Sequence, residues 1–415
     1  MNAIYFQQAT NFLTKEGIML SRSFTLLVLA FFLLMPCTVL ANDPGITDDE
    51  IVLGVTQPLT GPAAGWGVTI TGGMQAWADH INSQGGIHGR KIKLIIKDDG
   101  YNPARAMANL QEMKNDIFAV VAQLGSAPCN AAKDFYPENK IPLITAYGSL
   151  GIYQHQPKEA QKYYFISYPD YEDETEFLAT YAMKNLGAKK IAHFYQNDEY
   201  GLGANAGIKK ALKANPGKAE LVAEIPYEVT ERALGTHALK LKESGADLLI
   251  MTTMMSSGAI MTKELAKIAY HPTVMGNFPI GMPVMYKLAG ESWEGTYTNA
   301  SAHMGLPGFH PAADRVANII NEINPKLKGQ EVLALFGAAS MMHFAEGAKN
   351  AGRNLTRESL IKGMEMIKDW KPEGMGAPVT YGPDRHNGVN AIYLQIAKDG
   401  QHVPVGDYVV FPPKF

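Results

Sequence analysis

The sequence predicts an α/β protein built from two doubly wound, Rossmann-like lobes. Short apolar runs alternate with amphipathic stretches of helical spacing, an order typical of parallel sheets covered by helices on both faces. The same alternation begins again after about residue 168, and a chain of 415 residues is long enough for two domains. We therefore expect two similar α/β units in succession.

In the first half, apolar runs mark the expected strands and helical spacing marks the expected helices. Ile70, Met74, Trp77 and Ile81, for example, would share one face of a helix. The strands are expected at residues 51–55, 91–96, 118–122 and 142–145, and the helices at residues 67–82, 104–115 and 127–138.

The second half repeats this pattern and then changes. Helices are expected at residues 177–186, 204–214, 237–244 and 261–269, and strands at residues 190–195, 221–225, 248–251 and 273–275. The stretch at residues 309–366 is expected to be mainly helical. The tail predicts strands separated by Gly-rich turns, at residues 378–381, 391–396 and 403–405.

An export signal is expected at residues 1–41. The apolar run at residues 24–35 follows a basic residue and is short for a membrane span, which takes about 20 apolar residues. Val39 and Ala41 fit a small-residue cleavage site, so we expect cleavage after Ala41 and delivery to the periplasm. An uncleaved anchor is the alternative, and Met19 is an alternative start.

The charge and the cysteines restrict the class of protein further. The formal net charge of −3 argues against a nucleic-acid partner, which requires a basic footprint. Cleavage would leave Cys129 as the single cysteine, so no internal disulfide is expected. Lipidation of Cys37 is disfavoured by Pro36, because lipidation signals have small residues before the cysteine. After cleavage, no membrane span is expected.

The candidate site residues lie in the strand-to-helix turns, because ligands in open α/β sheets bind beyond the carboxyl ends of the strands. Trp66 ends the first turn, either as the wall of a cleft or as a surface-packed side chain. Ser126 fits a helix N-cap whose free N–H groups suit a carboxylate, with plain capping as the alternative. The turn at residues 145–149 has small residues and hydroxyls that allow a ligand near the backbone, or is an ordinary loop.

Enzyme and metal motifs are absent from the sequence. Glycines at 201, 203 and 207 do not have the dinucleotide spacing, and no nucleophile elbow, zinc-protease motif or phosphate loop occurs. The eleven histidines lack ligand spacing. The acidic run at residues 170–174 is expected to be a solvated helix start rather than a calcium site. We therefore expect no enzyme activity, no cofactor and no metal.

Several segments, in this order, resemble the branched-chain amino acid binding proteins of ABC importers, which have the type I periplasmic-binding-protein fold. The resemblance covers nearly all of the chain after residue 41. It is carried by Trp66-Gly67 and by residues 58–62 (PLTGP), 81–90 (INSQGGIHGR), 97–103 (KDDGYNP), 199–201 (EYG) and 378–388 (PVTYGPDRHNG).

The resemblance implies two lobes joined by three crossings, with the ligand in the cleft between the lobes. The crossings are expected near Tyr168, Tyr297 and Gly376. The first lobe would then comprise residues 42–167 and 298–375, and the second lobe residues 168–297 and 376–415.

The resemblance also implies site residues. In the family, a Ser after the third strand and an Ala-Thr pair after the fourth hold the ligand carboxylate. The Ser matches Ser126, and the pair matches Gly148 and Ser149, a conservative departure. The family's Trp in the first turn matches Trp66, and its Tyr before Gly matches Tyr200.

One departure concerns the ligand. Amino-acid-binding members hold the ligand ammonium with a Glu whose position is occupied here by Phe278, and a family aromatic that faces the ligand aligns to Met254 or Met255. Burying an unpaired amine costs several kcal/mol. We therefore expect a carboxylate with an apolar or aromatic tail, unless Asp198 or Glu199 replaces the missing acid.

These features predict the periplasmic solute-binding component of an ABC importer. It would bind a small carboxylate ligand between the lobes, close around it by a hinge, and pass it to the permease subunits, probably as a monomer. Binding and transport of branched-chain amino acids is the first alternative. A periplasmic sensor on the same fold is the second, although a sensor usually carries a membrane segment or an added domain.

Overall fold

The computed structural model describes residues 43–301 and 307–415. The expected signal peptide and its cleavage site lie outside these residues. In the part of the chain that is described, every helix is too short or too polar to cross a lipid bilayer.

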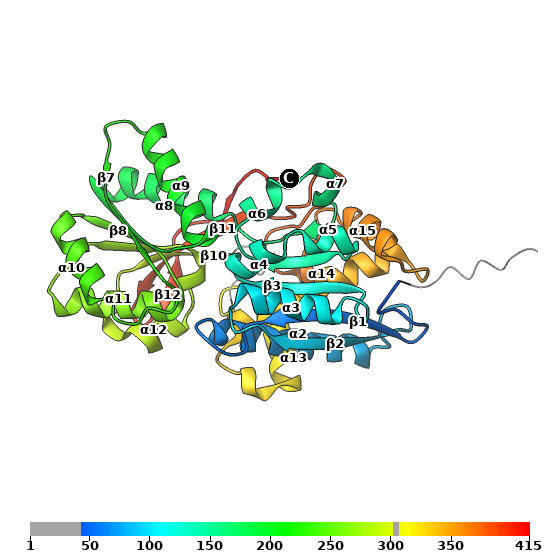
Figure 1. Cartoon of the computed structure of the whole chain (residues 1–415). Helices are drawn as coiled ribbons and strands as arrows, with labels where there is room; N and C mark the ends of the chain where they lie inside the picture. The colour runs from blue at the N-terminus through cyan, green and yellow to red at the C-terminus, as the bar shows by residue number, and fades with distance from the viewer. Residues whose placement is uncertain (1–42, 302–306) are drawn as a thin grey trace, which may run out of the picture. The chain divides into compact units, whose positions relative to one another are not determined.

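A five-stranded parallel sheet organises the first half of the chain (Figure 1). Its strand order is β2-β1-β3-β4-β5, and Ile51 of β1 pairs with Ile92 of β2. The inner strands β3 and β4 are buried along their whole length, because helices cover both faces. The strands are β1 (Glu50–Gln57), β2 (Lys91–Asp98), β3 (Ala119–Leu124), β4 (Leu143–Tyr147) and β5 (Tyr164–Phe165).

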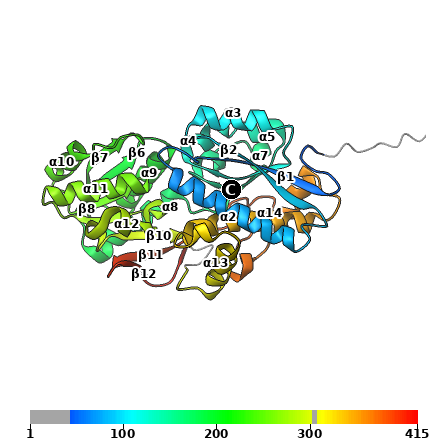
Figure 2. The ribbon, with the colours of Figure 1, turned by 90° about the horizontal axis from the view of Figure 1, so that it is seen from below.

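The helices around this sheet come from two distant parts of the sequence. α2 and α14 pack closely, since a Cβ at Gly73 would lie 2.0 Å from the carbonyl oxygen of Ala334. Figure 2 shows the two helices side by side. The helices are α2 (Ala64–Ser83), α3 (Pro103–Met113), α4 (Ser126–Ala132), α5 (Phe135–Asn139), α6 (Gly151–Gln154), α7 (Lys158–Gln161), α13 (Pro311–Ile323), α14 (Glu331–Ala351) and α15 (Arg357–Glu365).

A second, mixed sheet has the order β12-β11-β10-β9-β8-β6-β7, with β13 paired to β11. Strands β6 to β10 run parallel, and β11 joins β10 in the antiparallel direction. The strands are β6 (Lys190–Gln196), β7 (Glu220–Tyr227), β8 (Leu248–Thr252), β9 (Thr273–Gly276), β10 (Tyr297–Ser301), β11 (Ala391–Lys398), β12 (Gln401–Pro404) and β13 (Val409–Val410).

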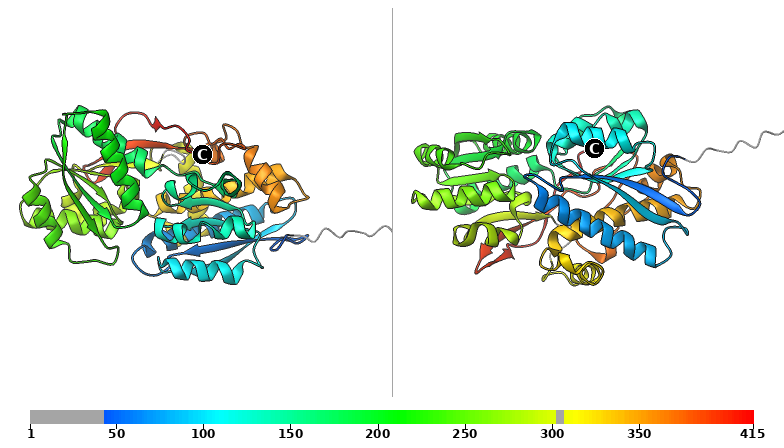
Figure 3. Two further views of the ribbon diagram at one scale, coloured as in Figure 1. Left: turned by 45° about the horizontal axis from the view of Figure 1, so that its top comes forward. Right: turned by 60° about the horizontal axis from the view of Figure 1, so that its bottom comes forward.

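The second sheet also carries helices, and Figure 3 shows them grouped with β6 to β12. The helices are α8 (Tyr171–Tyr181), α9 (Glu199–Ala214), α10 (Gly235–Ser244), α11 (Met255–Lys267) and α12 (Val284–Ala289). A π-helical turn, η1 (Ala182–Leu186), extends α8, and a 3₁₀ turn, η2 (Phe278–Ile280), follows β9. The predicted α/β class with two sheets is confirmed.

The strand assignments give the positions at which the chain changes sheet. It leaves the first sheet after β5 and enters α8, around Tyr168. The second crossing was expected near Tyr297, but β10 is hydrogen-bonded to β9 and β11, so the second sheet keeps the chain as far as Ser301. The chain returns to this sheet at Ala391, later than the expected Gly376.

The tail before β11 differs from its predicted structure. The strand expected at residues 378–381 is reduced to a single bridge between Trp370 and Val379. Tyr381 packs edge to face on Phe165 of β5, with ring centroids 5.4 Å apart. This segment therefore lies against the first sheet, because its apolar side chains are buried there rather than in the second sheet.

Candidate functional site

An aromatic pocket lies where strands of both sheets end. Its empty volume is about 370 Å³, at the lower end of the range for small-molecule sites. Five tyrosines and a tryptophan contribute most of its wall. The lining residues are Trp66, Tyr101, Leu124, Gly125, Ser126, Tyr147, Tyr168, Tyr171, Tyr200, Met254 and Pro279.

Strand ends position most of these side chains. On the first sheet, Ser126 follows β3 and Tyr147 ends β4. On the second sheet, Tyr200 follows β6, Met254 follows β8 and Pro279 follows β9. The carboxyl ends of parallel strands share one edge of a sheet, so residues far apart in sequence meet there. The arrangement therefore forms one site from two sheet edges.

Strands β3 and β4 are irregular where they approach this pocket. Ala122 and Thr145 have positive φ angles of 60° and 54°, a conformation that is costly for a β-branched Thr. They lie opposite each other and interrupt the regular register of the two strands. Beyond this point Leu124 and Tyr147 pair again, and both line the pocket. The irregularity thus directly precedes the two strand ends that form the wall.

Gly125 permits a close approach between its backbone and Tyr101. Its φ angle is 101°, and a Cβ at this position would lie 2.4 Å from a ring carbon of Tyr101. The Tyr101 hydroxyl accepts a hydrogen bond from Nε2 of Gln196, 3.1 Å away, which comes from the second sheet. Tyr101 therefore joins the two halves of the pocket.

Ser126 is the first residue of α4 and not its cap, which is Gly125. Its hydroxyl oxygen is buried and accepts a hydrogen bond of 3.0 Å from the backbone N–H of Ser149. The expected capping role is therefore wrong, because the side chain reaches across to the loop after β4. In this geometry the Ser126 hydroxyl hydrogen is available for an acceptor in the pocket.

Gly148 and Ser149 lie beside Ser126, but their roles in the pocket differ from the expectation. A Cβ on Gly148 would lie 3.3 Å from Cα of Ser126, so a small residue is needed there. Ser149 lines a separate, open pocket of about 700 Å³, together with Glu199 and Gly203. The structure therefore does not bring the hydroxyls of Ser126 and Ser149 into the same pocket.

Trp66, Phe278 and Phe336 form an aromatic wall at one side of the pocket. The Trp66–Phe278, Trp66–Phe336 and Phe278–Phe336 ring centroids are 6.0, 6.1 and 5.1 Å apart. Phe278 also meets Tyr168 edge to face at 5.4 Å, and only 1% of its surface is exposed. Of the two readings of Trp66, the structure has the one in which its ring lines the cleft.

The indole N–H of Trp66 has no hydrogen-bond partner within the described residues, although it is buried. A buried donor without a partner loses its hydration without compensation, which costs about 1–3 kcal/mol. Ligand acceptors commonly satisfy such groups in binding sites.

Behind the wall lies a buried carboxyl group that the sequence reading assigned to a solvated run. Glu174 of α8 is fully buried and accepts hydrogen bonds from the backbone N–H of Phe278 (3.2 Å) and from Nδ2 of Asn277 (3.3 Å). Burial raises its pKa to about 8, partly offset by these two hydrogen bonds. Oδ1 of Asn277 in turn accepts a hydrogen bond of 2.7 Å from the Tyr200 hydroxyl.

The expectation of a solvated helix start at residues 170–174 is wrong. Asp170 and Asp173 are also buried, and the ammonium of Lys414 lies 3.1 Å and 2.7 Å from their carboxylates. Asp170 caps α8 by accepting from the N–H of Glu172. The tail of the chain thus supplies the charge that neutralises this acidic segment.

Among the described residues that line the aromatic pocket, none carries a carboxylate or an ammonium group. Asp198 caps α9 and accepts a hydrogen bond from Gln196, and Glu199 accepts one from Asn130. Neither of the two acids lines this pocket, and Glu174 lies behind Phe278. In residues 43–301 and 307–415 no cluster of three or more potential metal ligands occurs.

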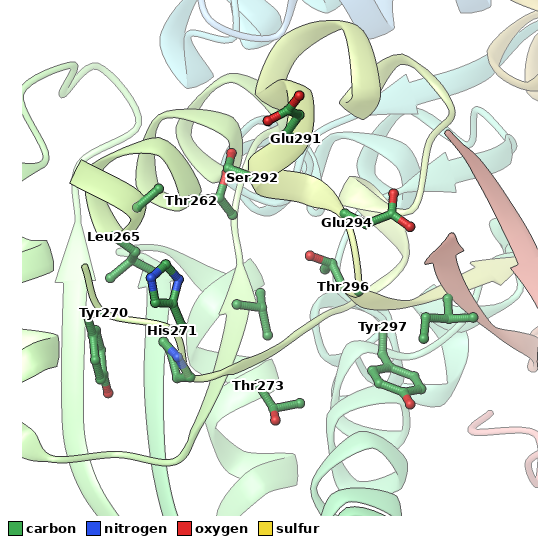
Figure 4. Close-up of a pocket in the computed structure, with 15 residues that line it drawn as sticks. Thr262, Leu265, Tyr270, His271, Thr273, Glu291, Ser292, Glu294, Thr296 and Tyr297 are labelled. Carbon is green, nitrogen blue, oxygen red and sulfur yellow. The ribbon is translucent and has the colours of Figure 1, made fainter. Parts of the chain in front are cut away.

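A further pocket of about 1100 Å³ lies at the opposite edge of the second sheet (Figure 4). It is lined by Thr273 and Tyr297, which begin β9 and β10, and contains none of the expected site residues. Its polar groups are engaged with neighbours: the Tyr270 hydroxyl donates to the carbonyl of Ala246 at 2.6 Å. We therefore assign ligand binding to the aromatic pocket at the carboxyl edge.

Sequence reasoning missed four tyrosines of the pocket, namely Tyr101, Tyr147, Tyr168 and Tyr171. Each follows or ends a strand of the first sheet or begins the first helix of the second, so strand-end position was the available signal. The reading could not choose between Met254 and Met255. In the structure Met254 lines the aromatic pocket and Met255 lines a neighbouring one.

Comparisons with known proteins agree with this architecture. The family model described as periplasmic binding protein matches residues 50–401. The Leu/Ile/Val-binding protein BraC3 of Rhizobium johnstonii is 26% identical, over 80% of this chain and 88% of the relative. The Leu/Ile/Val-binding protein of Escherichia coli K12 is also 26% identical, over 68% of this chain and 77% of the relative.

Solved structures share the fold. A fatty acid ABC transporter substrate-binding protein from Thermomonospora curvata has a TM-score of 0.78 at 22% identity, covering 89% of this chain and 95% of the other. The branched-chain amino acid transporter substrate-binding protein LivJ from Streptococcus pneumoniae, in complex with isoleucine, has a TM-score of 0.71 at 19% identity, covering 88% and 100%. The chain belongs to the periplasmic binding protein family, a family of solute-binding proteins with the type I fold.

Proposed function

We propose that this protein is the substrate-binding component of an ABC importer and that its ligand is a carboxylic acid without an α-amino group. The observation that carries the proposal is the composition of the aromatic pocket. Among its described lining residues, rings and one methionine provide an apolar surface, and no charged side chain is present. An apolar or aromatic tail fits this surface.

The carboxylate end of the ligand is assigned to Ser126. Its buried hydroxyl can donate to a carboxylate oxygen while its own oxygen accepts from the N–H of Ser149. Trp66 supplies a second donor, since its indole N–H has no partner among the described residues. Hydrogen bonds to charged groups contribute about 1.5–3 kcal/mol each.

An amino acid would lack a counter-ion for its ammonium in this pocket. Glu174 is the acid nearest to Phe278 in the hydrogen-bond network, but it accepts from the Phe278 backbone and its raised pKa, due to burial, keeps it neutral near pH 7. Tyrosine faces offer only weak cation–π attraction. Branched-chain amino acids, which some relatives bind by name, are therefore the second candidate.

The remaining assignments follow from the proposed role. Cleavage after Ala41 would release the protein into the periplasm, where it would act as a monomer and dock on permease subunits. The lobes would close around the ligand by a hinge at the crossings. Contacts between the two sheets, such as Gln196 to Tyr101, support a closed form of this kind.

Thermal-shift screening of residues 42–415 tests the proposal. The screen compares aromatic and aliphatic carboxylic acids with amino acids at equal concentration. We expect stabilisation by acids, since a ligand that binds the folded state alone raises the melting temperature. Stabilisation by leucine, isoleucine or valine, with none by any acid lacking the amino group, would support the second candidate instead.

A further inference from the structure

Two apolar pockets lie on the far side of the aromatic wall. One, of about 920 Å³, is lined by Phe278, Ala300, Phe309, Phe336 and others. The second, of about 950 Å³, is lined by Gly65, Met255, Leu288, Leu333 and others. The two pockets adjoin, because they share Met282, Pro283, Pro307 and Val332.

The wall between these pockets and the aromatic pocket is one side chain thick. Three pairs of consecutive residues divide between the two sides: Trp66, Met254 and Pro279 line the aromatic pocket, whereas Gly65, Met255 and Phe278 line the pockets behind it. The rings of Trp66 and Phe278 are in direct contact. A change in the rotamer of one of these side chains would therefore join the spaces.

We propose that the two adjoining pockets receive the tail of a long-chain aliphatic carboxylic acid whose carboxylate is bound at Ser126. This inference rests on the proposed function and extends it from small acids to long ones. The aromatic pocket alone has about 370 Å³, whereas the pockets behind the wall provide more than twice that volume.

Charge determines which end of the acid enters these pockets. Among the described residues, no Lys or Arg side chain lines either pocket, and Glu331 lines one of them. A carboxylate would be desolvated there next to another acid, which is unfavourable. The tail therefore enters past the wall, and the carboxylate stays at the Ser126 end.

The side chains along this route are able to adapt. Methionines 254, 255 and 282 have flexible, polarisable side chains that fit varied apolar shapes. The wall is held by ring contacts, and no hydrogen bond is printed between its side chains and those of the pockets. An aliphatic chain can thus replace part of the ring packing with its own contacts.

A chain-length series tests the inference by calorimetry on the mature protein, with hexanoate, octanoate, decanoate and dodecanoate. If the tail enters the pockets, affinity should rise by about fourfold for each added methylene through the series. If hexanoate binds and affinity stops rising or falls beyond it, the inference is overturned while the proposed function stands. If no acid binds, both are overturned.

A variant that fills the space provides the matched test. Val332 lines both pockets and begins α14, so Val332→Trp should weaken dodecanoate binding by tenfold or more, on the order of the gain from two buried methylenes. Hexanoate binding should be unchanged, which also shows that the variant is folded. Leu239→Trp, at a half-exposed position on α10, is the control and should change neither affinity. Equal dodecanoate affinity in the Val332 and control variants would overturn the inference.

Discussion

The indole of Trp66 and the phenyl ring of Phe278 meet edge to face, with ring centroids 6.0 Å apart and an interplanar angle of 79°. Trp66 follows a strand of the first sheet and Phe278 follows a strand of the second. Such ring pairs contribute about 0.5–1.5 kcal/mol beyond area burial. The contact therefore links the two halves of the site and should respond to their relative motion.

Trp66 should report ligand binding by fluorescence. Its ring loses or gains contact with Phe278 as the cleft opens or closes, and this changes the environment of the indole. We expect a change in emission when a binding acid is added. Trp66→Phe should lose this change while the other three tryptophans still emit. An identical response in the variant would remove Trp66 from the site.

Ser126→Ala should weaken binding of a carboxylic acid by about tenfold or more, because one charged hydrogen bond is lost. Ser149→Ala is the matched control: its side chain lines another pocket, and its backbone N–H remains in place. Calorimetry on both variants measures the difference. Equal losses in the two variants would contradict the assignment of the carboxylate to the Ser126 hydroxyl.

The hydrogen bond from Asn130 to Glu199 should stabilise the closed form, since it joins α4 of the first sheet to α9 of the second. Asn130→Ala should lower the ligand affinity severalfold by reducing the population of the closed state. Asn197→Ala removes a comparable bond, to Glu228, that lies within the second lobe, and should leave affinity unchanged. Small-angle scattering without ligand should show a more open average only for the Asn130 variant.

Glu174 should make stability depend on pH. Burial raises its folded-state pKa to about 8 from 4.5, so between these values the folded protein holds a proton that the unfolded chain releases. Its contribution to the free energy of unfolding therefore falls as the pH rises from about 4.5 to 8. Glu174→Gln has no proton to lose and should show a smaller fall in denaturation experiments. Parallel pH profiles for the two proteins would contradict the raised pKa.

The fold could be predicted from sequence because strand and helix periods are local signals. The helix expected at residues 67–82, for instance, corresponds to α2. Pocket composition was harder to predict, because it depends on which side of a turn each side chain faces. Met254 and Met255 are chemically identical neighbours, and only the backbone between β8 and α11 sends them to different pockets.

Burial of charge was the second feature that the sequence did not reveal. The acidic run at residues 170–174 has the composition of an exposed helix start, and its neutralising partner Lys414 is some 240 positions away in the chain. The same holds for the contact of Glu174 with the Phe278 backbone. Such pairs arise from the packing of distant segments, so local composition cannot indicate them.

The most direct test of the central claim compares leucine with 4-methylpentanoate, which differs from leucine only by the absence of the α-amino group. No charged side chain lines the pocket among its described residues, so the ammonium of leucine would be buried without a partner. Calorimetric titration of the mature protein should give tighter binding of 4-methylpentanoate, by at least tenfold. Tighter binding of leucine would contradict the account and indicate an ammonium site that uses Glu174 or another acid.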